Sequence, residues 1–153
     1  MPTFTRRGLL AAGAALAALP LIPARARAAS DARRLAATTR TLDVRGRAVP
    51  VMGLLGPDGR PGLALDPGER FRVDLVNDLA EPTIIHWHGQ IPPNAQDGVP
   101  DNPLPALAPG EARSFDFAAR PGTHWMHSHL ALQEMALLAA PLILRRAQEL
   151  AED

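Results

Sequence analysis

The histidines of this 153-residue chain fall into two short segments, HWHG at residues 86–89 and HWMHSH at residues 124–129. These two segments hold all five histidines of the chain. Imidazole nitrogens bind copper, zinc, iron and nickel, and a metal ion needs several ligands at once. The clustering therefore predicts a metal centre built from imidazole groups, in preference to isolated surface histidines.

The spacing within each segment gives a pair of the form His-x-His. Alternate residues of a β-strand point to the same face, so His86 and His88 share one face of a strand, and His127 and His129 share another. His124 falls on the opposite face from His127, and we expect it to pack or to hydrogen-bond. The other four histidines are the predicted metal ligands. Four nitrogen ligands would also satisfy zinc, so the spacing alone does not select the metal.

The composition excludes several other classes of site. Cysteine is absent, which removes disulfides, thiolate catalysis, iron–sulfur ligation and the thiolate of a blue-copper site. The sixteen basic residues, all arginine, balance sixteen acidic ones, so no basic excess indicates a nucleic-acid partner.

The elements that must hold the histidines are short β-type runs separated by turn signals, as in a sandwich or a barrel. The segment RFRVDLVN, residues 70–77, alternates polar and apolar side chains, which indicates a strand with one wet face. The expected strands lie near residues 41–44, 47–54, 62–65, 70–77, 83–88, 112–118, 122–127 and 138–144. We expect one domain over residues 41–145, a flexible lead-in over 29–40 and a charged helical tail over 146–153.

The N-terminus has the features of an export signal. Thr5-Arg6-Arg7-Gly8-Leu9-Leu10 is followed by an Ala- and Leu-rich stretch and by Ala26-Arg27-Ala28, a small-x-small cleavage pattern. This arrangement resembles a twin-arginine signal over residues 1–28. The apolar run is shorter than the roughly 20 residues of a membrane-spanning helix, so we expect no stable membrane span. The prediction is an exported, periplasmic protein.

The segments HWHGQIPPNAQDGVP, LAPGEARSFDFAARPGTHWMHSHLALQE and LLAAPLIL resemble the N-terminal cupredoxin domain of the multicopper oxidases, the laccase and copper-resistance oxidase family. The resemblance runs from about Thr41 to Leu144. It implies an all-β fold, a Greek-key cupredoxin-like β-sandwich, and copper as the cofactor. The family oxidises a reducing substrate and reduces dioxygen to water.

The resemblance also implies a role for each matched residue. His86 would bind the type 2 copper, and His88, His127 and His129 the type 3 pair. Asp97, in AQDGVP, matches an acidic residue that helps to deliver protons during oxygen reduction. The alternative for Asp97 is a turn-forming Asp-Gly dipeptide.

The chain carries only part of what the family reaction needs. The family's trinuclear cluster uses eight histidines, four of them from a further domain, and its electron-entry copper needs a cysteine. We therefore expect a truncated or split oxidase, inactive alone, whose partner is a second cupredoxin domain or chain; homo-oligomerisation through the ligand-bearing face is a further expectation. One alternative is a small exported copper-binding or chaperone module. Another is a zinc-dependent or cupin-like barrel, which Glu134 matches poorly because no histidine follows it.

Overall fold

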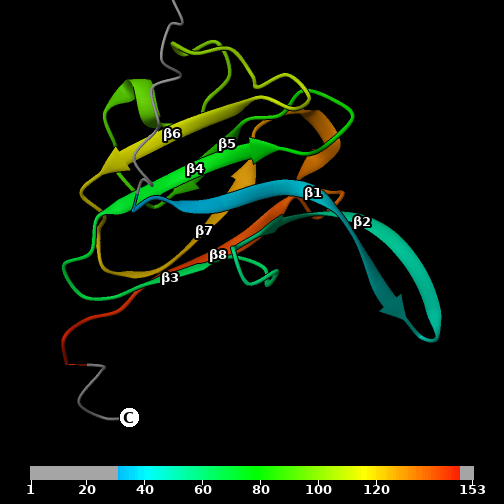
Figure 1. Ribbon diagram of the computed structural model, residues 1–153, viewed down its shortest axis with the longest axis horizontal. Coiled ribbons are helices and arrows are strands. Elements are labelled where there is room, and N and C mark those ends of the chain that lie inside the picture. Colours follow the sequence, from blue (N-terminus) through cyan, green and yellow to red (C-terminus); the bar gives the residue numbers. More distant parts are fainter. Residues whose placement is uncertain (1–30, 149–153) are drawn as a thin grey trace, which may run out of the picture. The chain divides into compact units, whose positions relative to one another are not determined.

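The computed structural model describes residues 31–148 and shows two β-sheets packed face to face (Figure 1). The all-β, cupredoxin-like sandwich expected from the sequence is confirmed. The predicted export signal and residues 149–153 of the predicted tail lie outside the described residues. Within residues 31–148, no helix combines the length and the apolar character needed to cross a membrane.

Each sheet has four strands, and neighbours in a sheet are often distant in the sequence. The first sheet has the order β2-β1-β4-β6 and the second has the order β3-β8-β7-β5. The first contains β1 (Arg33–Val44), β2 (Arg47–Leu55), β4 (Phe71–Asn77) and β6 (Ala112–Phe117). The second contains β3 (Leu63–Leu65), β5 (Ile85–His88), β7 (Gly122–Ser128) and β8 (Ala139–Leu144). Two short 3-10 turns, η1 (Asn94–Gln96) and η2 (Ala131–Gln133), follow β5 and β7.

Strand β1 corrects the expected start of the domain. The sequence predicted a flexible lead-in over residues 29–40, but β1 begins at Arg33. Its first residues pair in parallel with β4, and Leu35 and Ala37 are fully buried between the sheets. The Ala and Thr residues of this segment show no polar–apolar alternation. The segment is nevertheless a strand, because it is buried and pairs with β2 on one side and β4 on the other.

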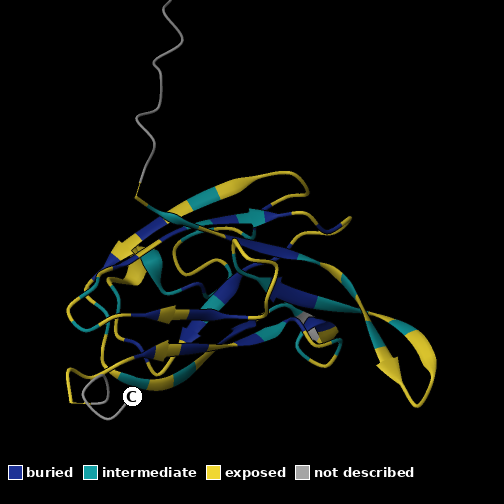
Figure 2. Ribbon diagram, turned by 60° about the horizontal axis from the view of Figure 1, so that its bottom comes forward, coloured by how far each residue is buried: buried dark blue, intermediate teal, exposed yellow. Residues whose placement is uncertain are grey.

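The core between the sheets is formed by large apolar side chains from both layers. The buried residues of both sheets are dark blue in Figure 2. The ring of Phe71 lies at its centre, 4.6 Å from the ring of Phe117 and 4.7 Å from that of Trp87. Trp87 is fully buried, and so is Met126 on the neighbouring strand. These residues fix the inward faces of β5 and β7 and thereby turn the intervening residues outward.

The remaining strands agree with the expected ones to within a few residues, and β4 shows the predicted alternation of buried and more exposed side chains. Strand β5 is shorter than expected. Thr83 precedes it and pairs instead with Leu107, through an isolated bridge of two hydrogen bonds. Arg145 to Gln148, described beyond β8, are not helical.

The β1–β2 hairpin extends beyond the sandwich, and β2 is an edge strand of its sheet (Figure 1). The backbone of β2 is nevertheless partly covered on its outer side. The amide of Met52 donates to the carbonyl of Ala136, and the carbonyl of Leu54 accepts from the amide of Gly62. Pro50 lies two residues before Met52, so its position also faces outward, and it has no amide hydrogen.

Candidate metal centre

Strands β5 and β7 place the two histidine segments side by side. Their antiparallel register sets His86 opposite His127 and His88 opposite Trp125. The residues between them, Trp87 and Met126, are paired as well and point into the core. The apolar partners therefore anchor the strands, and the histidines lie on the outer face of the sheet.

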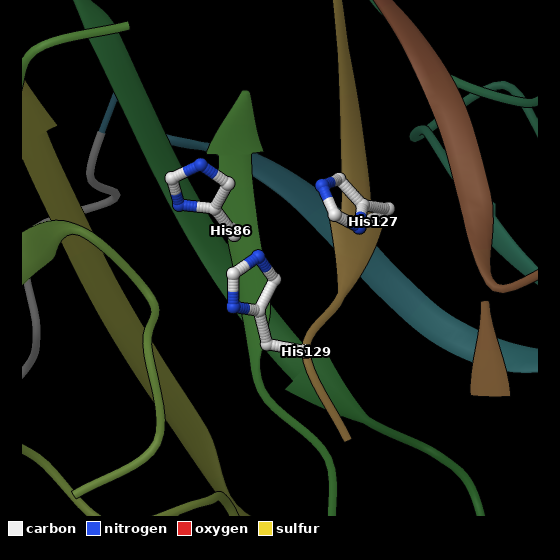
Figure 3. Close-up of side chains that lie close together, drawn as sticks. All are labelled: His86, His127 and His129. Carbon is white, nitrogen blue, oxygen red and sulfur yellow. The ribbon is translucent and has the colours of Figure 1, made fainter. Parts of the chain in front are cut away.

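Three of the four predicted ligands converge. One ring nitrogen from each of His86, His127 and His129 lies within 4.8 Å of the others. Figure 3 shows the His86 ring on β5, with the His127 ring on the neighbouring β7 and the His129 ring just beyond the end of β7. The ring centres of His86 and His129 are 4.7 Å apart, and those of His127 and His129 are 5.0 Å apart. This spacing suits the binding of metal by more than one imidazole.

His88 lies beside this group without belonging to it. The group with ligand atoms within 4.8 Å of one another does not include His88, although its ring centre is 5.5 Å from that of His127, and the residue is exposed. Its ring also faces Trp125 at 5.3 Å. The structure thus brings His86, His127 and His129 together and leaves His88 at the margin, facing solvent.

The hydrogen bonds of His86 and His127 decide which nitrogens are available to a metal. Nδ1 of His86 lies 2.8 Å from the backbone oxygen of Asp97, and Nδ1 of His127 lies 3.2 Å from that of Ser128. A carbonyl oxygen can only accept, so each Nδ1 carries the hydrogen and each Nε2 keeps a free lone pair. Metal-bound histidines are usually oriented in this way.

The surroundings of Nε2 of His127 show whether the histidines fit a metal ion. Among the side chains that the structure describes, this Nε2 is the only buried nitrogen or oxygen without a hydrogen-bond partner. Such an atom costs about 1–3 kcal/mol unless something binds it. Because it faces the other imidazoles, the donor set fits a metal ion that accepts neutral nitrogen ligands.

The loop after β5 is held against this strand by hydrogen bonds from His86 and Trp87. The indole nitrogen of Trp87 donates to the backbone oxygen of Gln96 at 2.8 Å, next to the bond between Asp97 and His86. The Asp97 carboxylate also lies near, with Oδ1 3.5 Å from Nδ1 of His86. Asp97 therefore contacts a predicted ligand both through its backbone and through its side chain.

A buried polar network behind β7 was not foreseen from the sequence. The side-chain oxygen of Gln133 accepts hydrogen bonds from Ser128 at 2.7 Å and from Thr83 at 2.8 Å. Its amide nitrogen donates to the carboxylate of Glu81 and to the backbone oxygen of Pro82. Ser128 lies between two predicted ligands, so this network braces the end of β7. No sequence pattern reveals it, because its members are up to 52 residues apart.

His124 and Trp125 occupy different surroundings from the ligand group. Nε2 of His124 lies 3.1 Å from the backbone oxygen of Arg120, which agrees with the hydrogen-bonding role expected for it. Trp125 is 40% exposed and stacks on the His127 ring, with ring centres 4.4 Å apart. It forms part of the outer face around the histidines.

The pKa of His129 is lowered from its ordinary value of 6.5, first by partial burial and then by the neighbouring His86 and His127. The unfolded chain therefore binds a proton more readily at this position than the folded chain does. Its stabilising contribution is complete above pH 6.5 and is lost as the pH falls through the lowered pKa of the folded state.

We therefore expect the copper-free chain to lose free energy of unfolding on acidification through this range, and His129→Gln to reduce the loss. The effect should stay below about 1 kcal/mol, because solvent screens this exposed residue. Urea unfolding on either side of the transition measures it. An equal loss in the variant would contradict this origin.

A β-sandwich with an outward-facing group of imidazoles defines a metal-binding cupredoxin-like domain, and comparisons with known proteins identify its family. Residues 37–149 match the family model described as multicopper oxidase. The chain is 35% identical over 104 residues to a copper resistance protein A homolog of Pseudomonas syringae pv. tomato, covering 67% of this chain and 18% of that protein. It is also 35% identical to L-ascorbate oxidase of Cucurbita maxima, over 61% of this chain and 17% of the relative.

Solved structures give the same assignment. A multi-copper oxidase from Pseudomonas thermotolerans superposes with a TM-score of 0.65 and 32% identity, over 73% of this chain and 28% of that one. A McoA multicopper oxidase variant from Aquifex aeolicus gives 0.67 and 28%, over 81% and 28% of the two chains. The chain belongs to the multicopper oxidase family. It spans less than a fifth of the length of the curated relatives named here, and membership implies that the metal is copper.

Proposed function

We propose that this chain supplies half of the ligands of a multinuclear copper centre, at which oxidation of a reducing substrate is coupled to reduction of dioxygen to water. The observation that carries the proposal is the buried, unpartnered Nε2 of His127 beside the ligand atoms of His86 and His129. By resemblance, His86 would hold the type 2 copper, and His88, His127 and His129 the type 3 coppers. Copper bound there would supply the one-electron redox chemistry.

The residues around the ligands would orient them and handle protons. The backbone oxygen of Asp97 accepts from Nδ1 of His86, so the lone pair of the neutral ring lies on Nε2. The Asp97 carboxylate lies 3.5 Å from Nδ1 of His86, and its side chain is 30% exposed. It can therefore exchange protons with water and release them at the histidine face, and we assign it proton delivery.

The other half of the ligands would come from a second cupredoxin domain or chain that docks on the outer face of the second sheet. Strands β5, β7 and β8 contain no Asp, Glu, Lys or Arg, whereas every strand of the first sheet carries at least one. Trp125 and Ile143 are exposed on this uncharged sheet. Uncharged faces with exposed apolar side chains are typical of interfaces. A second copy of this chain would meet the same face.

We infer export to the periplasm from the twin-arginine-like segment Thr5–Leu10 and the cleavage pattern Ala26-Arg27-Ala28. The twin-arginine pathway carries proteins that are already folded, which suits a domain with a bound metal.

Copper titration of the purified chain, combined with oxygen-uptake measurements, tests this function. The chain should retain copper after gel filtration and should consume no oxygen with a phenolic donor. Addition of a domain with four further histidines and a cysteine site should start oxygen uptake. Failure to retain copper, or oxygen uptake by the chain alone, would contradict the half-site. Gel filtration of the copper-free chain tests whether the partner is a second copy of the chain. A monomer at high concentration counts against homo-oligomers.

A further inference from the structure

We propose that Glu134 is a positioning residue for the metal site: its carboxylate holds the His127 ring in the tautomer whose Nε2 faces the other imidazoles. Oε2 of Glu134 lies 3.2 Å from Nδ1 of His127. In the sequence, Glu134 is only a poor match to the glutamate of a cupin motif. The contact instead places it directly behind a predicted ligand.

The Glu134 carboxylate adds a negative charge near Nδ1 of His127, which the backbone carbonyl of Ser128 does not carry. Nδ1 of His127 donates to the backbone oxygen of Ser128 at 3.2 Å, and the Glu134 carboxylate lies at the same distance from this nitrogen. A negative charge close to Nδ1 stabilises the ring hydrogen on that nitrogen more than on the more distant Nε2. Glu134 therefore favours the Nδ1–H tautomer of His127 and makes the imidazole a more basic ligand.

The two opposed histidines of β5 and β7 share this arrangement. His86 has the backbone oxygen and the carboxylate of Asp97 at Nδ1, and His127 has the backbone oxygen of Ser128 and the carboxylate of Glu134. The carboxylate distance is 3.5 Å for Asp97 and 3.2 Å for Glu134. Glu134 is thus at least as well placed toward its histidine as the aspartate singled out from the sequence.

The backbone around Glu134 is held firmly enough to aim the side chain. The amide of Leu137 donates to the carbonyl of Glu134, and the amide of Leu138 donates to that of Gln133, both at 2.9 Å. The Gln133 side chain is anchored in the buried network with Ser128 and Thr83. The same network therefore fixes the strand end that carries His127 and the turn that carries Glu134.

The first test needs no metal. Heteronuclear NMR of the imidazole nitrogens of the copper-free full chain, at mildly alkaline pH, reports the tautomer of each histidine. His127 should be wholly in the Nδ1–H form in the wild type. It should shift partly toward the Nε2–H form in Glu134→Ala, where only the Ser128 carbonyl at 3.2 Å favours Nδ1–H, and remain largely Nδ1–H in Glu134→Gln, whose amide oxygen can accept from Nδ1. An unchanged tautomer in Glu134→Ala would overturn the proposal.

The second test is copper affinity by chelator competition, and it rests on the proposed function. Loss of an orienting partner typically weakens metal binding by about 10- to 100-fold, so Glu134→Ala should bind copper at least tenfold more weakly, with Glu134→Gln between it and the wild type. Glu111→Gln is the matched control, because it removes the same charge from a distant glutamate that accepts from the Ala108 amide. Equal affinities in Glu134→Ala and the wild type would count against positioning. A wild type that binds no copper would refute the proposed function, while the tautomer measurement would still decide the role of Glu134.

Discussion

Replacement of His127 by alanine is expected to lower copper affinity by more than about 100-fold, beyond the loss caused by removing a residue that merely orients a ligand. The variant removes the buried Nε2 that lies with the ligand atoms of His86 and His129. Stability should respond differently. Removing the unpartnered Nε2 relieves a cost that offsets the lost Nδ1 hydrogen bond and the lost stacking of the ring on Trp125, so the free energy of unfolding of the copper-free chain should change by less than about 1 kcal/mol.

His124→Ala is the matched control for this prediction. His124 lies on the same strand, but its Nε2 faces the backbone oxygens of Arg120 and Pro121. We expect this variant to lose about 1 kcal/mol of stability with the hydrogen bond and to keep its copper affinity. Competition titration and urea unfolding of both variants give four values. A His127→Ala chain that binds copper like the wild type would refute the assigned centre.

Replacement of Gly98 by alanine is expected to have the largest effect on the fold and to disturb the site with it. Gly98 has a φ of +76°, and a Cβ there would lie 1.8 Å from the backbone oxygen of Ile85. The loop would have to move away from β5, which would break the bonds from Trp87 to Gln96 and from His86 to Asp97. We expect a loss of about 3 kcal/mol or more in unfolding free energy and a copper affinity about tenfold lower or worse.

Gly110→Ala separates backbone strain from this collision. Gly110 has a φ of +80°, but no atom lies within 4 Å of the place that a Cβ would take. It should lose only the roughly 1–2 kcal/mol of a left-handed residue and should bind copper normally. Thermal unfolding and competition titration of the two variants make the comparison. Equal losses in both would show that the loop does not rest on β5 as described.

The sequence predicted the parts of the molecule that obey a local period. The alternation in Phe71–Asn77 and the His-x-His spacing each require only a few neighbouring residues, and both led to the correct faces. The start of β1 could not be predicted in this way, because Leu35 and Ala37 are buried by pairing with a strand about forty residues away.

The surroundings of the histidines were harder to predict than the strands that carry them. Gln133 contacts Thr83 across 50 residues, and Glu134 reaches His127 only because the η2 turn bends the chain back after β7. The separation of His88 from the other three histidines follows from the strand register, which sets His88 opposite Trp125 while His129 lies beyond the other end of the pair. Strand parity alone does not determine this register. Strand parity predicted the face on which the histidines lie, whereas their contacts depend on tertiary packing.

The outer side of β2 has a consequence for how copies of this chain can meet. An open edge strand can pair with a strand of another chain, because its backbone amides and carbonyls are free, and repeated pairing leads to aggregation. Here Pro50 removes one such donor, and Met52 and Leu54 are already engaged by Ala136 and Gly62. Copies of this chain should therefore not add to one another along β2, which leaves the outer face of the histidine-bearing sheet as the favoured place of contact.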